Sequence, residues 1–396
     1  MRGNAPVRCG PEAIPEWTLP DGVSLANAQF TIKYYDSIIT NGNSIPSSAV
    51  RTWEFKTNEY GIIRYASSYK SSGPDLFTNS LGRPSLPAGT IVIEETTPPS
   101  GFFVNTNKYI LTITIADNGA ATWHEYEYDG STTTDRGVIK TLNVSQTADL
   151  DTQVKELLKP VISTVALNNI TGTHVGVTRT NDTVTDTVYI EYALPGTAYT
   201  LKAELRDADT GDLISTVTRD TTAPRSSNAY VGYEVTMPPF RFNSSDFTGR
   251  TVVVYEYMYY KDGAEVISEH AELVEEQMIR YPEVTTEATD ADTGNHAGTV
   301  KEEATVKDSV QCSNLVVGQE YTVNGTLRYQ EDFTDANGTS HKKEDIVELK
   351  DGSVTEKTFP ATASHMEIEL TFIVDSTLLE GTTVVAFEDL YVEDIN

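Results

Sequence analysis

Cysteine is nearly absent from this sequence, which holds two in 396 residues, Cys9 and Cys312. Two such distant cysteines give neither a disulfide framework nor the spacing of a metal site, so any covalent reinforcement must use another chemistry. The six histidines are scattered, and the sequence has no Gly-x-Ser-x-Gly motif and no convincing catalytic pair. We therefore expect no metal, no cofactor and no enzyme with turnover, such as a secreted hydrolase.

Basic residues are also scarce: 29 lysines and arginines stand against 58 aspartates and glutamates, a formal net charge of −29. A surface this acidic repels nucleic-acid phosphates and anionic lipids, which argues against nucleic acid as a partner. No apolar run reaches transmembrane length, and Met1 to Asn4 do not begin a signal peptide. We expect no direct membrane contact from this chain, and we expect export and anchoring signals to lie outside it.

What the sequence does contain is typical of β-structure. Thr, Val, Tyr and Ile recur throughout, and branched and aromatic side chains suit a half-buried pleated surface. Strand-like runs such as 198–205, 251–257 and 367–374 stand between breaks rich in Gly, Asp, Asn and Pro. The length suits three domains of about 120–150 residues. The pattern therefore predicts an all-β chain of three tandem β-sandwich domains.

An internal repeat sets the boundaries of the second and third domains. At an offset of 122 residues, a threonine is followed 22 residues later by an aspartate in both copies, and a glutamate later ends a Val-rich run seven residues after a glycine. The matching pairs are Thr164 with Thr286, Asp186 with Asp308, and Glu256 with Glu388. Only the length of the middle differs, as expected for surface loops. We predict homologous domains at 160–280 and 281–396.

Each repeat also carries an Asp-Ala-Asp-Thr-Gly segment, at 207–211 and at 290–294, that superficially suggests a calcium loop. The later ligand positions and the closing glutamate of an EF-hand loop are missing. We therefore predict hairpin turns at both places.

Residues 1–145 follow a different pattern. Leu-Ala-Asn-Ala-Gln-Phe (25–30) begins a strand, and Leu-Pro-Ala-Gly-Thr (86–90) comes before an apolar strand. That strand ends in Glu-Glu-Thr and is followed by Pro-Pro-Ser-Gly-Phe (98–102). This order of motifs resembles the Cna B-type (SpaA-like) pilin domain over most of residues 20–145, and the resemblance implies an Ig-like β-sandwich.

That family often forms an isopeptide bond between a lysine on its first strand and an asparagine, and the resemblance implies that Glu95 is the matching catalytic acid. Asn143 could supply the amide. However, residues 1–24 contain no lysine, and Lys33 lies on the following strand. We predict no isopeptide bond in this domain, which leaves Glu95 as a buried or edge carboxylate.

Between the first domain and the repeats, we predict a linker at residues 146–159. Its segment 151–158, Asp-Thr-Gln-Val-Lys-Glu-Leu-Leu, could form one or two helical turns. Pro160 would end the linker and begin the next domain.

The repeats carry the motif with the most specific chemistry. Val-Ala-Phe-Glu at 385–388 matches the signature of the VaFE, or T-Q ester-bond, domain of Gram-positive surface proteins, and Val-Tyr-Glu at 254–256 is a variant of it. The resemblance covers both repeats and implies an ester between Thr164 and Gln277. It also implies three assisting residues, Asp186, Glu256 and His270. Glu272 stands where the family usually has an aspartate after the histidine.

Physical chemistry supports the same reaction. Amides resist alcohols in water, so the site must hold the hydroxyl against the carboxamide. A buried, protonated carboxyl of Glu256 or Asp186 would hydrogen-bond the carboxamide oxygen. His270 would take the Thr164 proton or give one to departing ammonia. Taken singly, each residue could be an ordinary strand, turn or surface residue, whereas the ordered set favours the cross-link.

The second repeat has only part of this set. It contains Thr286, Asp308 and Glu388, but the matching histidine and glutamine would fall beyond Asn396. We expect no ester through such a glutamine in this chain. We also expect the closing strand to be missing, which leaves an open sheet edge.

These features predict a non-enzymatic, extracellular segment of a cell-wall-anchored Gram-positive adhesin stalk or pilus, whose partners are neighbouring domains of the same surface protein. The alternative is a ligand-binding adhesin whose first domain recognises a host surface protein or glycan. Four aromatic residues are candidates for such a site, although core packing explains them equally well: Tyr34, Tyr35, Trp53 and Trp123.

Overall fold

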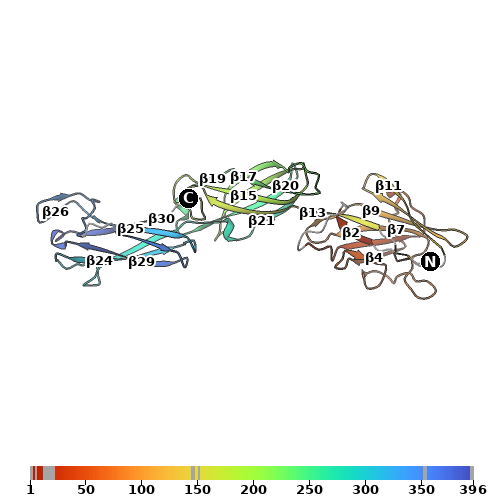
Figure 1. Ribbon diagram of the computed structural model, residues 1–396, viewed down its shortest axis with the longest axis horizontal. Coiled ribbons are helices and arrows are strands. Elements are labelled where there is room, and N and C mark those ends of the chain that lie inside the picture. Colours follow the sequence, from red (N-terminus) through yellow and green to blue (C-terminus); the bar gives the residue numbers. More distant parts are fainter. Residues whose placement is uncertain are drawn as a thin grey trace. The chain divides into compact units, whose positions relative to one another are not determined.

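The computed structural model describes residues 3–4, 7–11, 23–143, 148–149, 152–350 and 355–392 (Figure 1). Throughout these ranges the regular secondary structure consists of β-strands and short 3-10 helices, which confirms the all-β prediction for them. No helix among the described residues is long and apolar enough to cross a membrane. The chain divides into two compact units, residues 1–159 and 160–396.

The first unit is built around two sheets. An antiparallel seven-stranded sheet has the order β11-β10-β9-β7-β3-β4-β6, and a four-stranded sheet has the order β5-β2-β13-β8. β1 and β12 form a separate parallel pair. The elements are β1 (Gly3–Asn4), β2 (Val7–Pro11), β3 (Gln29–Tyr35), η1 (Gly42–Ser44), β4 (Arg51–Lys56), β5 (Ile62–Ile63), β6 (Lys70–Ser72), β7 (Gly89–Thr97), β8 (Phe102–Phe103), β9 (Lys108–Ile115), β10 (Ala121–Tyr128), β11 (Thr133–Leu142), β12 (Ala148–Asp149) and β13 (Thr152–Leu158).

The segment expected to be a linker is part of this unit, so the linker prediction was wrong for residues 152–158. These residues form β13, which pairs in parallel with β2 and antiparallel with β8. Every second side chain of β13 is buried: Thr152, Val154, Glu156 and Leu158. That period of two is the period of a strand, and pairing with a strand more than 140 residues earlier overrides the local helical tendency. Residues 144–147 and 150–151 lie outside the described part.

The four aromatic residues considered for a ligand site lie in the interior of the first unit. None is more than 5% exposed: Tyr34, Tyr35, Trp53 and Trp123. The Trp53 indole N–H donates a hydrogen bond to the Pro74 oxygen at 2.9 Å, and its ring meets that of Tyr65 edge-on at 5.5 Å. Core packing therefore explains these residues, and they form no aromatic-lined surface site.

The second unit contains the two sequence repeats. In the first repeat, one sheet has the order β14-β15-β18, with β19 also on β15. The other sheet has the order β17-β16-β20-β21, with β22 also on β20. The elements are β14 (Val161–Asn168), β15 (Asp182–Ala193), β16 (Ala198–Asp207), β17 (Leu213–Thr222), β18 (Val231–Thr236), β19 (Phe240–Phe242), η2 (Ser244–Phe247), β20 (Thr251–Tyr260), β21 (Val266–His270), η3 (Glu275–Gln277) and β22 (Met278–Arg280).

The second repeat uses the same strand pairing. Its sheets have the orders β23-β24-β29 and β28-β25-β30, and β26 pairs with β27. The elements are β23 (Glu283–Asp290), β24 (Ala304–Ser313), β25 (Glu320–Tyr329), β26 (Phe333–Thr334), β27 (Ser340–His341), β28 (Thr355–Pro360), β29 (Met366–Val374), η4 (Ser376–Leu378) and β30 (Val384–Val392). Within the described residues β30 pairs only with β25. The missing closing strand stays a prediction, because residues 393–396 lie outside the described part.

The two Asp-Ala-Asp-Thr-Gly segments form turns. Residues 207–211 begin the turn of the β16–β17 hairpin, where Asp207 accepts hydrogen bonds from the backbone of Asp209 and Thr210. Residues 290–294 make the same kind of turn, but at the start of the longer connection from β23 to β24. Among the described residues, no group of His, Cys, Asp and Glu side chains could hold a metal ion.

Candidate cross-linking site

Thr164 and Asp186 come from the first two strands of the first repeat. On the antiparallel β14 and β15, Thr164 pairs with Val188 and Ala166 pairs with Asp186. Thr164 and Asp186 are therefore diagonal neighbours on one face, and that face is buried: their exposed fractions are 3% and 0%. The Thr164 hydroxyl donates a hydrogen bond to Oδ1 of Asp186. The expected nucleophile thus contacts a carboxyl group that can accept its proton.

Glu256 and His270 come from the opposite sheet. Burial alternates along the second half of β20, so that Glu256 occupies an inward position with no exposed surface. It pairs directly with His270 of β21, which is half-buried. A strand pattern that would normally place an apolar residue in the core therefore places a carboxyl group there.

Gln277 is the last residue of η3, the turn that connects β21 to β22. The turn is closed by a hydrogen bond from the Gln277 backbone N–H to the Val274 oxygen at 3.0 Å, and η3 lies against β14 and β20. The Gln277 side chain is fully buried, and its Oε1 lies 2.6 Å from Nδ1 of His270. Its amide nitrogen, Nε2, has no hydrogen-bond partner. A buried amide left unpaired costs about 1–3 kcal/mol, so this nitrogen requires an explanation.

The electrostatics of the site follow from burial. Burial, and then the neighbouring Asp186 carboxyl, raise the pKa of Glu256 to about 10. Burial also raises the pKa of Asp186, although Glu256, Thr164 and His270 each act to lower it. Glu256 is therefore protonated at neutral pH, because two carboxylates cannot both ionise in one dry pocket. Neither oxygen of Glu256 makes a hydrogen bond of ordinary geometry.

The structure brings the five expected residues of the first repeat together, but with a different geometry from the one expected for His270. We expected His270 at the Thr164 proton or at the leaving nitrogen. Instead, Asp186 contacts the Thr164 hydroxyl, and His270 contacts the carboxamide oxygen of Gln277. Glu272 is exposed and outside this group.

The second repeat contains half of the same arrangement. The Thr286 hydroxyl donates a hydrogen bond to Asp308, which is fully buried. Burial, and then Asp308, raise the pKa of Glu388 to about 8. Thr286 is exposed, in contrast to Thr164, and it borders a cavity of about 560 Å³ between β23 and β30. Among the described residues, no histidine and glutamine complete this half-site as His270 and Gln277 complete the first.

Glu95 lies in the interior of the first unit at 8% exposure. Its Oε2 accepts a hydrogen bond from the Asn105 backbone at 2.6 Å, and burial raises its pKa. Its side chain also interacts with Glu156 of β13, a buried acid that sequence analysis did not identify. Lys33 instead pairs with Glu94 at 2.5 Å, and neighbouring strand residues face opposite sides of a sheet, so Lys33 does not serve Glu95. The absence of an isopeptide bond stays a prediction.

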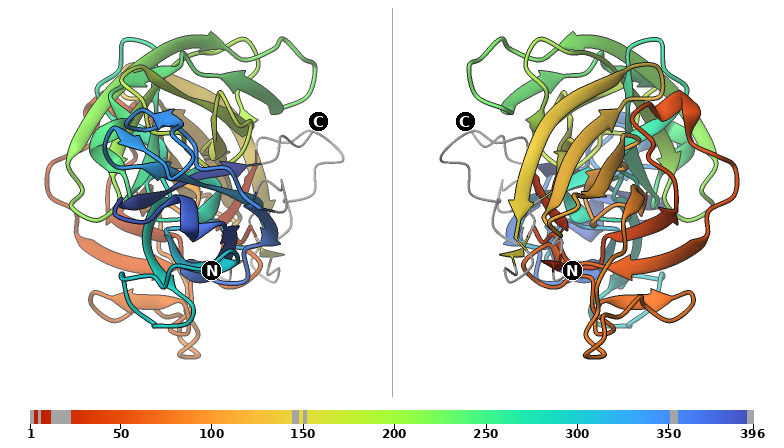
Figure 2. Two further views of the ribbon diagram at one scale, coloured as in Figure 1. Left: turned by 90° about the vertical axis from the view of Figure 1, so that its left-hand side faces the viewer. Right: turned by 90° about the vertical axis from the view of Figure 1, so that its right-hand side faces the viewer.

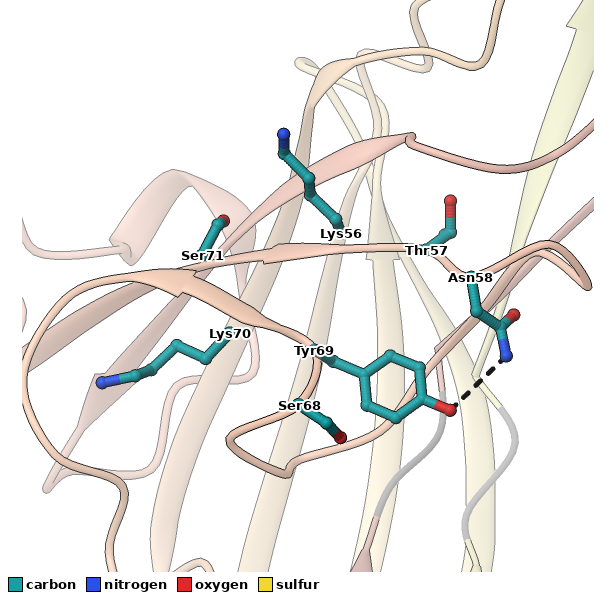
Figure 3. A pocket seen from close by; sticks show the side chains of 7 residues that line it. All are labelled: Lys56, Thr57, Asn58, Ser68, Tyr69, Lys70 and Ser71. Atoms are coloured by element: carbon teal, nitrogen blue, oxygen red, sulfur yellow. Dashed lines mark hydrogen bonds between the residues drawn. The ribbon is translucent and has the colours of Figure 1, made fainter.

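The first unit also has a small surface pocket of about 370 Å³ near the ends of β4 and β6 (Figure 3). It is lined by Lys56, Thr57, Asn58, Ser68, Tyr69, Lys70 and Ser71. Asn58 donates a hydrogen bond to the Tyr69 hydroxyl at 3.4 Å, and the Lys70 ammonium group donates to two backbone oxygens. These groups are occupied by the protein itself, and the pocket is separate from the cross-linking site.

Three further residues near the site were missed by sequence analysis. Asn168, Asp182 and Tyr281 are fully buried and hydrogen-bonded to one another. The signal that could have identified them is their spacing, because each lies four residues from Thr164, Asp186 or Gln277.

Among the solved structures with some similarity to the chain are two pilins and an adhesin. They include the full-length major pilin SpaD from Corynebacterium diphtheriae (11% identity, 100% of this chain, 87% of that chain, TM-score 0.37). A Mobiluncus mulieris adhesin with intramolecular disulfide, isopeptide and ester bond cross-links matches at 14% identity over 58% of this chain and 81% of that chain, with a TM-score of 0.27. The T6 backbone pilin of Streptococcus pyogenes matches at 10% identity over 99% of this chain and 80% of that chain, with a TM-score of 0.29. These scores are too low to carry an argument.

No curated protein sequence matches the chain significantly. The decisive comparison is with a family model. The model of the T-Q ester bond containing domain matches residues 160–280 and again residues 282–395, which together make up more than half of the chain. The chain therefore belongs to the family of proteins with T-Q ester bond containing domains.

Proposed function

We propose that the first repeat forms an ester between Thr164 and Gln277, once and without a cofactor. One observation carries the proposal: the Thr164 hydroxyl is hydrogen-bonded to a buried carboxyl group, while the buried Gln277 carboxamide is hydrogen-bonded to His270. The unpartnered Gln277 nitrogen also supports it, because this is the group that must leave as ammonia. A reaction of this kind needs fixed geometry more than it needs a strong nucleophile.

The reaction balances with the residues of the site alone. Oγ1 of Thr164 attacks Cδ of Gln277, and the hydroxyl proton passes to Asp186. His270, with Nδ1 protonated, donates a hydrogen bond to Oε1 and stabilises the negative charge that develops there. The tetrahedral intermediate then breaks the Cδ–Nε2 bond, the proton held by Asp186 moves to the nitrogen, and ammonia leaves. Glu256 stays neutral, which avoids a second negative charge beside Asp186.

The ester would close a loop of more than 100 residues between the first strand of the repeat and the segment that follows its last long strand. Restricting the unfolded chain in this way contributes about 5 kcal/mol in the chain-entropy model. The mechanical effect of the ester matters more for a stalk than this gain in stability. Tension that enters at β14 and leaves after β22 passes through the ester and not through the sheets. Such a domain suits a protein that is exposed to pulling forces and proteases.

We infer from this that the chain is an extracellular stalk or pilus-like segment of a Gram-positive surface adhesin, acting through its neighbouring domains and not as an enzyme. The family match and the cross-linking geometry support this role. The alternative, a receptor-binding first domain, loses its aromatic candidates to the core of the first unit.

The test is the intact mass of the full chain. Ester formation expels one ammonia, so the chain should be lighter than its sequence by about 17 Da. Thr164→Ala should restore the full mass, and digestion should yield one peptide pair that joins the Thr164 segment to the Gln277 segment. An unchanged wild-type mass in well-folded protein would overturn the proposal.

A further inference from the structure

A second buried polar group lies beside the cross-linking site and does not take part in the proposed chemistry. Nδ2 of Asn168 donates to both carboxylate oxygens of Asp182, at 3.0 and 2.9 Å, and the Tyr281 hydroxyl donates to Oδ2 of Asp182 at 2.7 Å. The Thr183 backbone N–H also donates to Asp182. We call Asn168, Asp182 and Tyr281 the Asp182 network. Its three members have no exposed surface.

The Asp182 network repeats the layout of the cross-linking site on the same three segments. On β14, Asn168 lies four residues after Thr164; on β15, Asp182 lies four residues before Asp186; and after η3, Tyr281 lies four residues after Gln277. Residues four apart on a strand share a face and are separated by about 13 Å. In both places a β14 side chain bonds to its diagonal β15 carboxyl group. The network is therefore a noncovalent contact parallel to the proposed ester.

Backbone contacts seat the end of the same segment. The Arg280 N–H donates to the His174 oxygen at 2.8 Å, and the Tyr281 N–H donates to the Arg250 oxygen at 3.0 Å. A Cβ atom at Gly176 would lie 2.2 Å from Cε1 of Tyr281, so the Tyr281 ring packs directly on a glycine backbone. Tyr281 is thus held by its hydroxyl, its ring and its backbone. These contacts fix the position of the chain shortly after Gln277.

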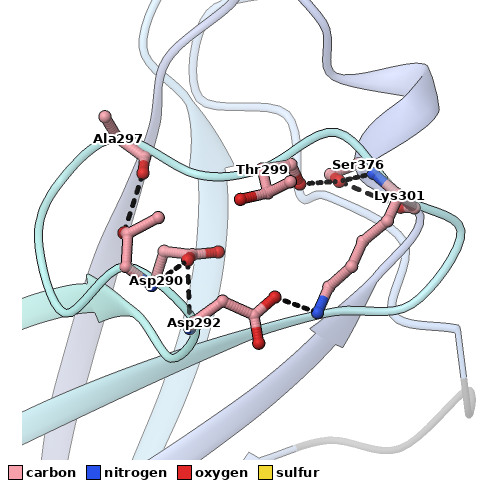
Figure 4. A network of polar contacts seen from close by, with 7 residues as sticks. Asp290, Asp292, Ala297, Thr299, Lys301 and Ser376 are labelled. Atoms are coloured by element: carbon pink, nitrogen blue, oxygen red, sulfur yellow. Dashed lines mark hydrogen bonds and ion pairs between the residues drawn. The ribbon is translucent and has the colours of Figure 1, made fainter.

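The second repeat shows that a hairpin equivalent to β14–β15 forms without the Asp182 network. Asp290 and Ala304 stand at the positions of Asn168 and Asp182. Asp290 keeps the turn contacts: it accepts one hydrogen bond from the backbone of Asp292 (Figure 4) and another from the backbone of Thr293. Asn168 makes the equivalent contacts to Ile170 and Thr171. The hairpin forms in both repeats, so the carboxyl group of Asp182 is not required for the turn. Its hydrogen bond from the Tyr281 hydroxyl instead joins the hairpin to the third segment.

We propose that Asn168, Asp182 and Tyr281 are positioning residues that hold the segment after η3 on β14 and β15, so that Gln277 is presented to Thr164 before the ester forms. The proposal rests on the proposed ester and deepens it, because it assigns residues that control the rate of bond formation. Before the bond exists, Gln277 reaches the site only on a three-residue strand, β22, and the last turn η3. The fraction of time that this segment is seated multiplies the rate of attack.

The test compares two tyrosine substitutions in the full chain. Tyr281→Phe removes the network hydroxyl and keeps the ring. Tyr199→Phe is the matched control, since Tyr199 is also fully buried in the first repeat and its hydroxyl accepts a hydrogen bond from Leu194 at 3.0 Å. Each chain is made by cell-free synthesis, sampled over time, quenched in acid and weighed intact, and the fraction without ammonia gives the rate.

We expect Tyr281→Phe to slow ammonia loss about tenfold, the effect of losing one charge-assisted hydrogen bond, and Tyr199→Phe to leave the rate unchanged. Equal rates for wild type and Tyr281→Phe, or equal slowing by both substitutions, would overturn the positioning role while the ester stands. No mass loss in the wild type would overturn the ester, and the rate claim with it.

A second measurement tests how firmly the segment after η3 is held, apart from the chemistry of ester formation. In the Thr164→Ala chain no ester can form, and the segment after η3 is held by noncovalent contacts alone. Adding Tyr281→Phe to this chain should speed amide hydrogen exchange at Ile279 to Tyr281, whereas adding Tyr199→Phe should not. Unchanged exchange at these amides would show that the network does not hold the segment.

Discussion

Nδ1 of His270 lies 2.6 Å from Oε1 of Gln277, whereas the Thr164 hydroxyl donates a hydrogen bond to Asp186. The two partners of the proposed ester are thus held by two different side chains, one able to donate a hydrogen bond and one able to accept a proton. This separation means that nucleophile activation and carbonyl polarisation can be tested by different substitutions.

His270→Ala should slow ester formation by about 10²- to 10³-fold without preventing it. The substitution removes the donor at the developing oxyanion, and the loss of one such donor has this size in acyl transfer. The measurement is the time course of ammonia loss by intact mass. His296→Ala, an exposed histidine of the second repeat, is the control and should leave the time course unchanged. A His270→Ala chain that reacts as fast as the wild type would contradict the assigned role.

Thr164→Ala should destabilise the first repeat by about 5 kcal/mol, because the uncross-linked chain regains the entropy of an open loop when it unfolds. Hydrogen exchange of peptides from β15 and β20 measures this locally. Thr286→Ala makes the same chemical change in the second repeat, where the hydroxyl also bonds to an aspartate. It should leave protection of β15 and β20 as in the wild type, and equal losses from both substitutions would argue against a covalent contribution.

Glu256 should make the uncross-linked first repeat less stable as pH rises. Its pKa is about 10 in the folded chain, against an ordinary value of 4.5. Between these values the folded state holds a proton that the unfolded state has released, so stability is full below about pH 4.5 and falls as pH rises toward 10. Thermal unfolding of Thr164→Ala between pH 5 and 9 should show this fall.

The matched chain for this measurement is Thr164→Ala with Glu256→Gln, which has a neutral side chain of similar shape. Its unfolding temperature should depend less on pH, and the difference between the two slopes isolates Glu256 from the other acids. Parallel slopes would mean that the Glu256 carboxyl is not held protonated in the interior.

In the first repeat, the sequence was sufficient to predict those site residues whose inward position follows from the local strand pattern. Alternation along 161–168 and 254–259 determines which side chains face inward, so Thr164 and Glu256 could be assigned to the interior from their spacing. The contact of His270 with the Gln277 oxygen could not, because it depends on how η3 turns after β21. The spacing of Asn168, Asp182 and Tyr281 from the cross-linking residues could have marked them as candidates, but not their hydrogen bonds, since Asp182 and Tyr281 are 99 residues apart and only the fold brings them together.

The error at residues 152–158 has the same origin. The local sequence suits a short helix as well as a strand, and the choice is made by β2 and β8, which supply the hydrogen bonds for β13. Glu156 lies on this strand and interacts with Glu95, so the sequence did not predict that these two acids meet in the first unit. Distant strand pairing is the kind of information that composition and periodicity do not hold.

The chain should lose one ammonia and not two. Thr286 and Asp308 repeat the Thr164–Asp186 contact, but no glutamine follows Glu388 in this sequence. The intact mass should therefore fall by about 17 Da, the mass of one ammonia, and Thr286→Ala should show the same loss as the wild type. A second ammonia lost from the wild type, and absent from Thr286→Ala, would reveal a cross-link that this arrangement does not account for.

The first unit should also lose stability as pH rises, through a different acid. Glu125 is 8% exposed, and burial, followed by the charge of Glu127, raises its pKa to about 7 from an ordinary 4.5, although Arg136 acts in the opposite direction. The folded state therefore holds an extra proton between these values, and stability falls from about pH 4.5 to about pH 7 and then levels off. The fall should be on the order of 1–3 kcal/mol, discounted for solvent screening.

Tryptophan fluorescence isolates this unit, because all three tryptophans of the chain, Trp17, Trp53 and Trp123, belong to residues 1–159. Denaturant midpoints measured at pH 5 and pH 8 should differ less in Glu125→Gln than in the wild type. Some difference should remain, because burial raises the pKa of Glu95 as well. Glu59→Gln, at an exposed position, should keep the full wild-type difference. If Glu125→Gln also keeps the full wild-type difference between pH 5 and pH 8, then Glu125 is ionised in the folded unit and burial does not raise its pKa.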